Sequence, residues 1–158
     1  MDLEQVLAIA LHTAAFVVVW GYYGTLARMI LPGLAGALDL PAQARTLAAI
    51  ERRALPLVAL SVGLFVVSGT YLLVINPDYR GLGSFGTTWA VLMLLKHLLV
   101  IGLVGLGVII DYLIRGLPDV VRDEDRAADM RWLRWAAEGA TALGALIVLL
   151  TAAAQGAI

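Results

Sequence analysis

The chain has 158 residues, of which 61% are hydrophobic and only 15% are charged, and its formal net charge is -1. A mean hydropathy of +0.91 does not suit a water-covered surface, so the composition indicates an integral membrane protein. Nucleic-acid binding is excluded because the sequence has no basic patch. The chain contains no cysteine, so any metal must bind histidine, methionine or oxygen ligands.

The apolar runs predict an all-α fold: one domain over residues 1–158, a four-transmembrane-helix bundle with up-down-up-down topology. Pro32 and Gly33 are expected to end the first helix, and the second is expected to begin before the membrane and to pass Pro56 with a kink. The start of the chain has no basic segment before its apolar run, so no removable signal peptide is expected. The four helices are expected at about 5–31, 46–75, 89–114 and 132–154.

Basic residues are concentrated in the two connections that lie between helices one and two and between helices three and four, whereas the opposite side has Arg80 alone. By the positive-inside rule, both basic connections face the cytoplasm and both termini face outward. The predicted location is therefore the bacterial cytoplasmic (inner) membrane, with several passes through it. Trp89 is expected at the outer interface, Trp132 and Trp135 at the inner one, and the charge run 122–126 on a solvated face.

The third expected helix carries Lys96 and His97 side by side inside the membrane, where an ionisable residue costs at least ~2.5 kcal/mol. His12, in the first helix, and His97 are the only histidines, and each is expected ~10–12 Å below the outer surface. The first and third helices run in the same direction and are diagonal partners in such a bundle. The two imidazoles are therefore predicted to face each other and to ligate a b-type haem, or alternatively copper.

Met93 shares a helix face with Lys96 and His97. The predicted cofactor-binding residues are thus His12, Met93, Lys96 and His97, with His12 and His97 as the metal ligands. Lys96 has no carboxylate at its own depth. It is expected either to pair with a haem propionate or an acidic substrate group, or to extend along its stem to the outer headgroups.

A simpler alternative is that the two histidines are unrelated polar residues that hydrogen-bond to neighbouring helices. The glycines of the first three helices, such as Gly24, Gly69 and Gly107, are likewise open to two interpretations. They either admit a flat macrocycle or let the helices pack closely.

Several short motifs occur along the chain: His12 followed by Trp20-Gly21, a basic segment leading into the second helix, Gly69 with Tyr71 near its end, and a Thr-rich turn leading to Lys96. Together they resemble the copper resistance protein D family of membrane proteins. They are also similar to the related haem-containing, HemJ-type protoporphyrinogen oxidases, which share the helix 1 histidine and the helix 3 lysine.

The first resemblance implies copper uptake across the inner membrane, and the second implies haem b and oxidation of a tetrapyrrole. Carried over by position, His12 matches the helix 1 histidine and Lys96 the helix 3 lysine, whereas His97 has no counterpart in either family. Full-length copper resistance D proteins have further helices, so a complete transport pathway is not implied.

Four hypotheses follow from the sequence. The leading one is a b-type haem membrane protein that transfers electrons near the outer face, with a redox partner or a larger membrane complex beside it in the lipid bilayer. The second is a copper-binding or copper-transport protein that uses His12, Met93 and His97. The third is a protoporphyrinogen oxidase-like enzyme, and the fourth is an accessory subunit of a membrane complex without a cofactor of its own.

Overall fold

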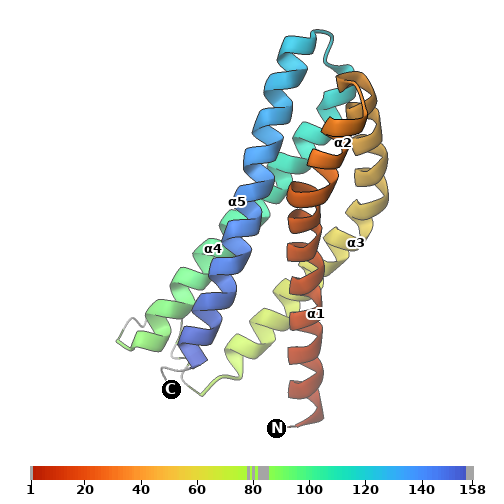
Figure 1. Cartoon of the computed structure of the whole chain (residues 1–158). Coiled ribbons are helices and arrows are strands. Elements are labelled where there is room, and N and C mark those ends of the chain that lie inside the picture. The colour runs from red at the N-terminus through yellow and green to blue at the C-terminus, as the bar shows by residue number, and fades with distance from the viewer. Residues whose placement is uncertain (1, 78, 80, 82–85, 156–158) are drawn as a thin grey trace.

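The computed structural model describes residues 2–77, 79, 81 and 86–155, and all regular structure in this part of the chain is helical (Figure 1). Four helical segments are long and apolar enough to cross a membrane: Leu3–Ala37, Leu40–Val74, Thr88–Asp119 and Asp123–Ala154. The predicted all-α, four-helix membrane fold is confirmed. Its elements are α1 (Leu3–Thr25), the π-helical turn η1 (Leu26–Ile30), α2 (Leu31–Ala37), α3 (Leu40–Val74), α4 (Thr88–Gly116), the 3-10 turn η2 (Leu117–Asp119) and α5 (Asp123–Gln155).

The expected end of the first helix at Pro32 and Gly33 is wrong, because the helical path continues through α2. A proline lacks an N–H and its ring crowds the carbonyl four residues earlier. Immediately before Pro32 the chain makes a π-helical turn, in which the Leu31 N–H bonds to the Leu26 carbonyl, five residues back. This wider turn places Pro32 in the first turn of α2, where a proline is tolerated.

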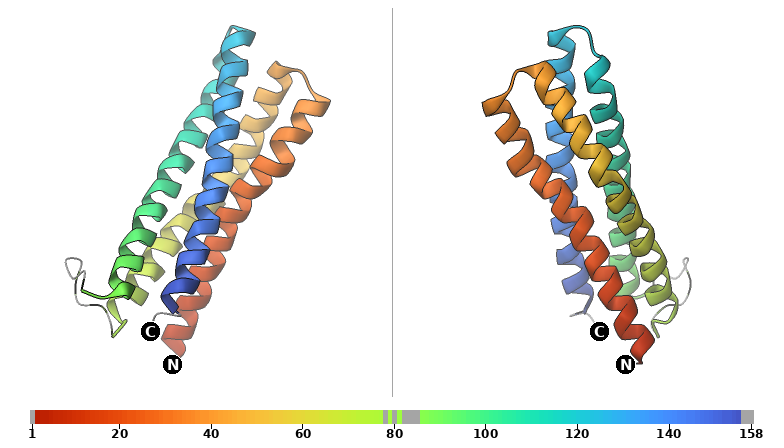
Figure 2. Two further views of the ribbon diagram at one scale, coloured as in Figure 1. Left: turned by 60° about the vertical axis from the view of Figure 1, so that its left-hand side comes forward. Right: turned by 90° about the vertical axis from the view of Figure 1, so that its right-hand side faces the viewer.

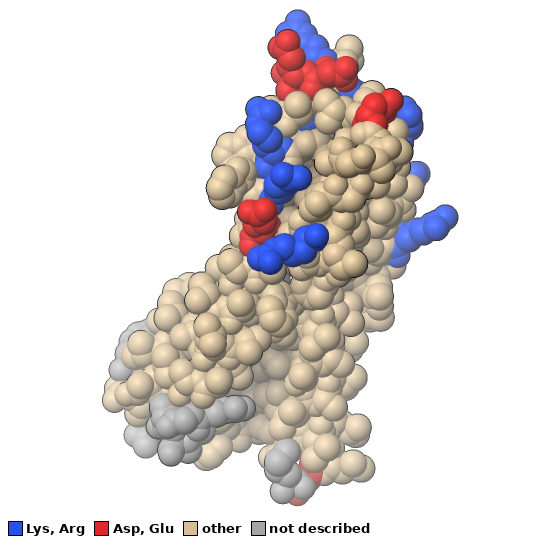
Figure 3. All heavy atoms as spheres, in the orientation of Figure 1, with Lys and Arg blue, Asp and Glu red and all other residues tan. Residues whose placement is uncertain are grey.

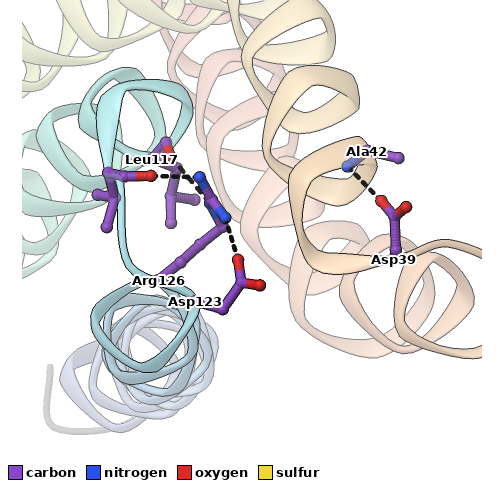
Figure 4. A network of polar contacts seen from close by, with 6 residues as sticks. Asp39, Ala42, Leu117, Asp123 and Arg126 are labelled. Carbon is purple, nitrogen blue, oxygen red and sulfur yellow. Dashed lines mark hydrogen bonds and ion pairs between the residues drawn. The ribbon is translucent and has the colours of Figure 1, made fainter.

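The second long helix begins at Leu40, before its predicted apolar span, and its start is well defined. The Asp39 side chain accepts a hydrogen bond of 2.8 Å from the Ala42 N–H, and Pro41 occupies the first turn (Figure 4). The helix then passes Pro56 without a break, as the sequence predicted. Its course bends between its two ends in Figure 1, which is the usual effect of an internal proline.

In the bundle, α4 packs along α5 and α1 packs along α3, while α1 and α4 lie across the bundle from each other (Figure 2). The N-terminus and the end of α5 lie at one end, and the α2–α3 and α4–α5 connections lie at the other, which we call the basic end. Lys and Arg gather over this basic end in Figure 3. Arg80, the single basic residue expected on the opposite side, lies outside the described residues.

The two halves of the bundle differ in packing. The largest fully buried side chains all belong to the half near the basic end: Leu26, Leu31, Leu47, Ile110, Ile114, Leu117 and Leu133. The tight core is therefore in one half, and the other half contains the cavity described below.

Small residues let aromatic rings lie close to neighbouring helices. A Cβ atom at Gly144 would overlap the Trp20 ring, whose Nε1 donates a hydrogen bond of 2.9 Å to the Thr141 carbonyl. A Cβ atom at Gly107 would overlap the Tyr23 hydroxyl. The Gly107 contact agrees with the helix-packing interpretation for that glycine, whereas a Cβ atom at Gly21, Gly63 or Gly105 would meet nothing within 4 Å.

The expectation of a solvated charge run at 122–126 is wrong for Arg126, which is 7% exposed. Its guanidinium pairs with Asp123 at 2.5 Å and donates hydrogen bonds to the Val120 and Leu117 carbonyls (Figure 4). These bonds tie the first turn of α5 to η2. Arg126 is therefore a structural residue of the α4–α5 connection.

Candidate metal-binding cavity

A cavity of about 530 Å³ lies between the four long helices, in the half of the bundle opposite the basic end. Its walls come from the start of α1, the end of α3, the start of α4 and the end of α5, and most of them are apolar. We call it the imidazole cavity, because both histidines of the chain line it. All four residues predicted to bind a cofactor are in its walls: His12, Met93, Lys96 and His97.

The His12 ring is held against α3. It stacks on the Phe65 ring with a centroid distance of 4.1 Å, and its Nδ1 lies 3.0 Å from the Phe65 carbonyl oxygen and 3.2 Å from Ser68 Oγ. A carbonyl only accepts hydrogen bonds, and the Ser68 hydroxyl already donates its proton to the Leu64 carbonyl. Both contacts therefore require the proton on Nδ1, which leaves the lone pair on Nε2.

Glycine at position 69 is what allows this placement. A Cβ atom at Gly69 would lie 2.8 Å from His12 Cε1 and 3.2 Å from Nδ1, closer than side chains pack. Any larger residue would push the imidazole off α3 and away from the Phe65 carbonyl. Gly69 is thus matched to His12 across the α1–α3 contact.

The second histidine has the same arrangement on its own helix. His97 Nδ1 lies 2.6 Å from the Met93 carbonyl oxygen, so this nitrogen also carries the proton and Nε2 keeps its lone pair. No described residue forms a hydrogen bond to Nε2 of either histidine. Metal-binding imidazoles typically donate the other ring N–H to a carbonyl or carboxylate in this way, which fixes the tautomer.

Lys96 is half-buried in the cavity wall, and no carboxylate of the described residues lies within 4 Å of it. The nearest candidate in sequence, Asp111, pairs instead with Arg115 at 2.7 Å. Lys96 therefore gives the cavity wall a basic side chain without a carboxylate partner among the described residues. His97 differs in burial, since its side chain is exposed while it lines the cavity.

One expectation about this region is wrong. Trp89 was expected at the outer lipid interface, but it is 8% exposed and lines the imidazole cavity. Trp132 and Trp135 are exposed on α5, and their place at the inner interface stays a prediction.

Sequence reasoning missed Phe65 and Ser68, which hold His12. The available signal was a serine beside a glycine, Ser68-Gly69, within an apolar run. Among the described residues no group of three or more His, Cys, Asp or Glu side chains gathers in a way that could hold a metal ion. What the cavity offers is two imidazoles and one thioether.

The fold and this cavity define a four-helix membrane protein with two tautomer-fixed histidines in one half of its bundle. Within that class, the family model of copper resistance protein D matches residues 48–154, and the chain belongs to that family. The match covers most of α3 and all of α4, with Met93, Lys96 and His97, whereas His12 precedes it. Neither a curated protein nor a solved structure matches the chain.

Proposed function

We propose that the chain is a copper-binding membrane protein in which His12, Met93 and His97 supply the ligands. The observation that carries this proposal is the pair of imidazoles in the walls of one cavity with a methionine. Each imidazole has its Nδ1–H bonded to a carbonyl, and its Nε2 has no partner among the described residues. Imidazole nitrogen and thioether sulfur are donors that suit copper, and thioethers favour Cu(I). Membership of the copper resistance protein D family supports the same metal.

The distribution of donors favours capture of copper from one side of the membrane. The chain has two histidines and four methionines, and Met29 and Met130 lie toward the basic end, away from the imidazole cavity. They do not form a continuous series of ligands through the bundle. We therefore assign the chain a copper-receiving role at the outer half of the bacterial inner membrane, beside a redox partner or a larger membrane complex.

Haem b is the second candidate ligand, and the size of the cavity favours it. About 530 Å³ with mostly apolar walls is more room than a single ion needs. His12 and His97 would hold the haem through their Nε2 atoms, and Lys96 would supply a positive charge for a propionate. When bound, a b-type haem would supply one-electron transfer.

Copper binding by the purified full chain tests the proposal. Competition with a Cu(I) chelator is expected to show one tight site. His12→Ala and His97→Ala are each expected to lower its copper affinity by about tenfold or more, since even changes to residues that support metal ligands lower affinity by about tenfold. Met93→Leu is expected to weaken it too. Met29→Leu is the matched control, because Met29 is exposed and lies outside the cavity, and it should bind copper normally.

Unchanged copper affinity in the double variant His12→Ala/His97→Ala would overturn the copper assignment. A reduced-minus-oxidised visible spectrum of the same preparations decides the second candidate. Sharp Soret and α bands that are lost in both histidine variants, together with weak copper binding, would replace copper by haem b.

A further inference from the structure

A second cavity, of about 430 Å³, lies at the basic end of the bundle. It is lined by residues of α3, α4 and η2, and its charged groups have both signs. We call it the arginine cavity, after three of its lining residues. The full lining consists of Arg45, Ala48, Glu51, Arg52 and Leu55 of α3, Arg115 of α4, and Pro118 and Asp119 of η2.

The arginines of this cavity have N–H groups that form no hydrogen bond to the described residues. Arg52 bonds to the Ala48 carbonyl at 3.3 Å through Nε, and Arg115 bonds to Asp111 at 2.7 Å, also through Nε. The terminal Nη groups of both residues have no partner among the described residues, and Arg45 has no described hydrogen bond or ion pair. Guanidinium groups with free terminal nitrogens are well suited to binding a phosphate.

Glu51 gives the same cavity a buried carboxylate. It is 5% exposed, and Oε2 accepts a hydrogen bond from the Tyr22 hydroxyl. No described residue bonds to Oε1, yet the described residues include no sealed-off polar side-chain atom without a partner. Oε1 is therefore open to the cavity that Glu51 lines, where it can accept hydrogen bonds from a cation.

The arginine cavity lies at the level of lipid headgroups. Arg126 of α5 bonds to the Leu117 carbonyl, which sets these two residues at one level. The exposed Trp132 is six residues further along α5, about 9 Å deeper in the membrane, whereas Arg115 is only about 3 Å from Leu117 along α4. Because exposed tryptophans mark the membrane–water interface, Arg115 is on the water side of that interface.

We propose that the arginine cavity binds the headgroup of phosphatidylethanolamine. The phosphate would lie against Arg52 and Arg115 with Arg45 nearby, and the primary ammonium would donate to Glu51 Oε1. A purely anionic headgroup fits less well, because the cavity also presents the carboxylates of Glu51 and Asp119. This site is independent of the imidazole cavity, since no residue lines both.

Lipid titration of the delipidated full chain, followed by native mass spectrometry, tests this proposal. The probes are phosphatidylethanolamine, phosphatidylcholine and phosphatidylglycerol with identical acyl chains. Phosphatidylethanolamine is expected to bind about fivefold more tightly than phosphatidylcholine, whose ammonium has no N–H, because about fivefold corresponds to one partly exposed ion pair. It should also bind more tightly than phosphatidylglycerol.

The variants separate the two halves of the headgroup. Arg52→Gln/Arg115→Gln should weaken all three lipids. Glu51→Gln, which still accepts the Tyr22 hydrogen bond, should abolish the preference over phosphatidylcholine. Arg53→Gln is the matched control, because Arg53 is the next residue of α3 and does not line the cavity. Circular dichroism of each variant checks that its helices are retained.

Three outcomes would overturn the proposal. Equal affinity for phosphatidylethanolamine and phosphatidylcholine would show that the protein does not recognise the primary ammonium group. Tighter binding of phosphatidylglycerol would make the site an anionic-lipid site. Displacement of the lipid by equimolar glycerophosphoethanolamine would show that a water-soluble phosphate ester, rather than a lipid, is the ligand.

Discussion

At the scale of single residues, the two histidines differ in what fixes their rings. His97 uses a carbonyl of its own helix, four residues back, so its tautomer is set locally. His12 uses Phe65 and Ser68 of α3, so its ring orientation depends on how α1 and α3 pack. The position of His12 Nε2 therefore depends on residues of α3 as well as on its own helix.

Gly69→Ala tests this dependence. The new methyl group would lie 2.8 Å from His12 Cε1, so the ring must leave the Phe65 carbonyl. Copper affinity, measured by chelator competition, is expected to fall by about 10- to 100-fold, as for other changes that disturb a ligand's hydrogen bond. The matched control is Gly63→Ala on the same helix, where nothing lies within 4 Å of the added carbon. Equal affinities for the two variants would contradict the assigned role of Gly69.

The residues that the sequence could predict are those whose position depends on spacing along one helix. Met93, Lys96 and His97 share one cavity wall, as helical periodicity predicted, whereas the depth of His12 in the membrane stays a prediction. The partner of His12 could not be predicted, because it depends on which faces of α1 and α3 meet. Trp89 was misplaced for the same reason, since periodicity does not show whether a helix face meets lipid or a cavity.

At the scale of helices and connections, the sequence predicted which helices exist and their order along the chain better than it predicted where each helix ends. Pro32 was expected to end a helix, but the π-helical turn before it places the proline in the first turn of α2. No residue type in the sequence predicts such a turn. The charge run 122–126 was similarly ambiguous. Its charges indicated a water-facing connection, but Arg126 is buried against η2, where its guanidinium donates to the Leu117 and Val120 carbonyls.

Arg126→Gln tests the role of this connection. The substitution removes the ion pair with Asp123 and the hydrogen bonds that the guanidinium donates to the Val120 and Leu117 carbonyls, of which the Leu117 carbonyl keeps the Val120 N–H as a donor. The unfolding free energy in detergent is expected to fall by about 1.5–3 kcal/mol, the contribution of hydrogen bonds to a charged group. Arg122→Gln, in the same connection but exposed, should change it by less than about 0.5 kcal/mol. A loss equal to that of Arg122→Gln would show that the Arg126 contacts are dispensable.

At the scale of the whole molecule, the bundle is divided into a tightly packed half at the basic end and a half that contains the imidazole cavity. This division is consistent with the proposed function. Ligand binding needs space and free lone pairs, whereas the packed half can hold the four helices in register. The cavity half contains both histidines, and the packed half carries most of the basic residues, so under the proposed function the orientation of the chain decides from which side copper would enter.

Cysteine labelling tests that orientation, and the chain suits the method because it has no cysteine of its own. Val121→Cys places a thiol in the exposed α4–α5 connection, and Asp2→Cys places one before α1 at the opposite end. The excess of arginine at the basic end predicts that it stays in the cytoplasm. A membrane-impermeant maleimide should therefore label Asp2→Cys but not Val121→Cys in intact spheroplasts, and both after lysis. The reverse pattern would place the imidazole cavity on the cytoplasmic side, and copper would then reach it from the cell interior.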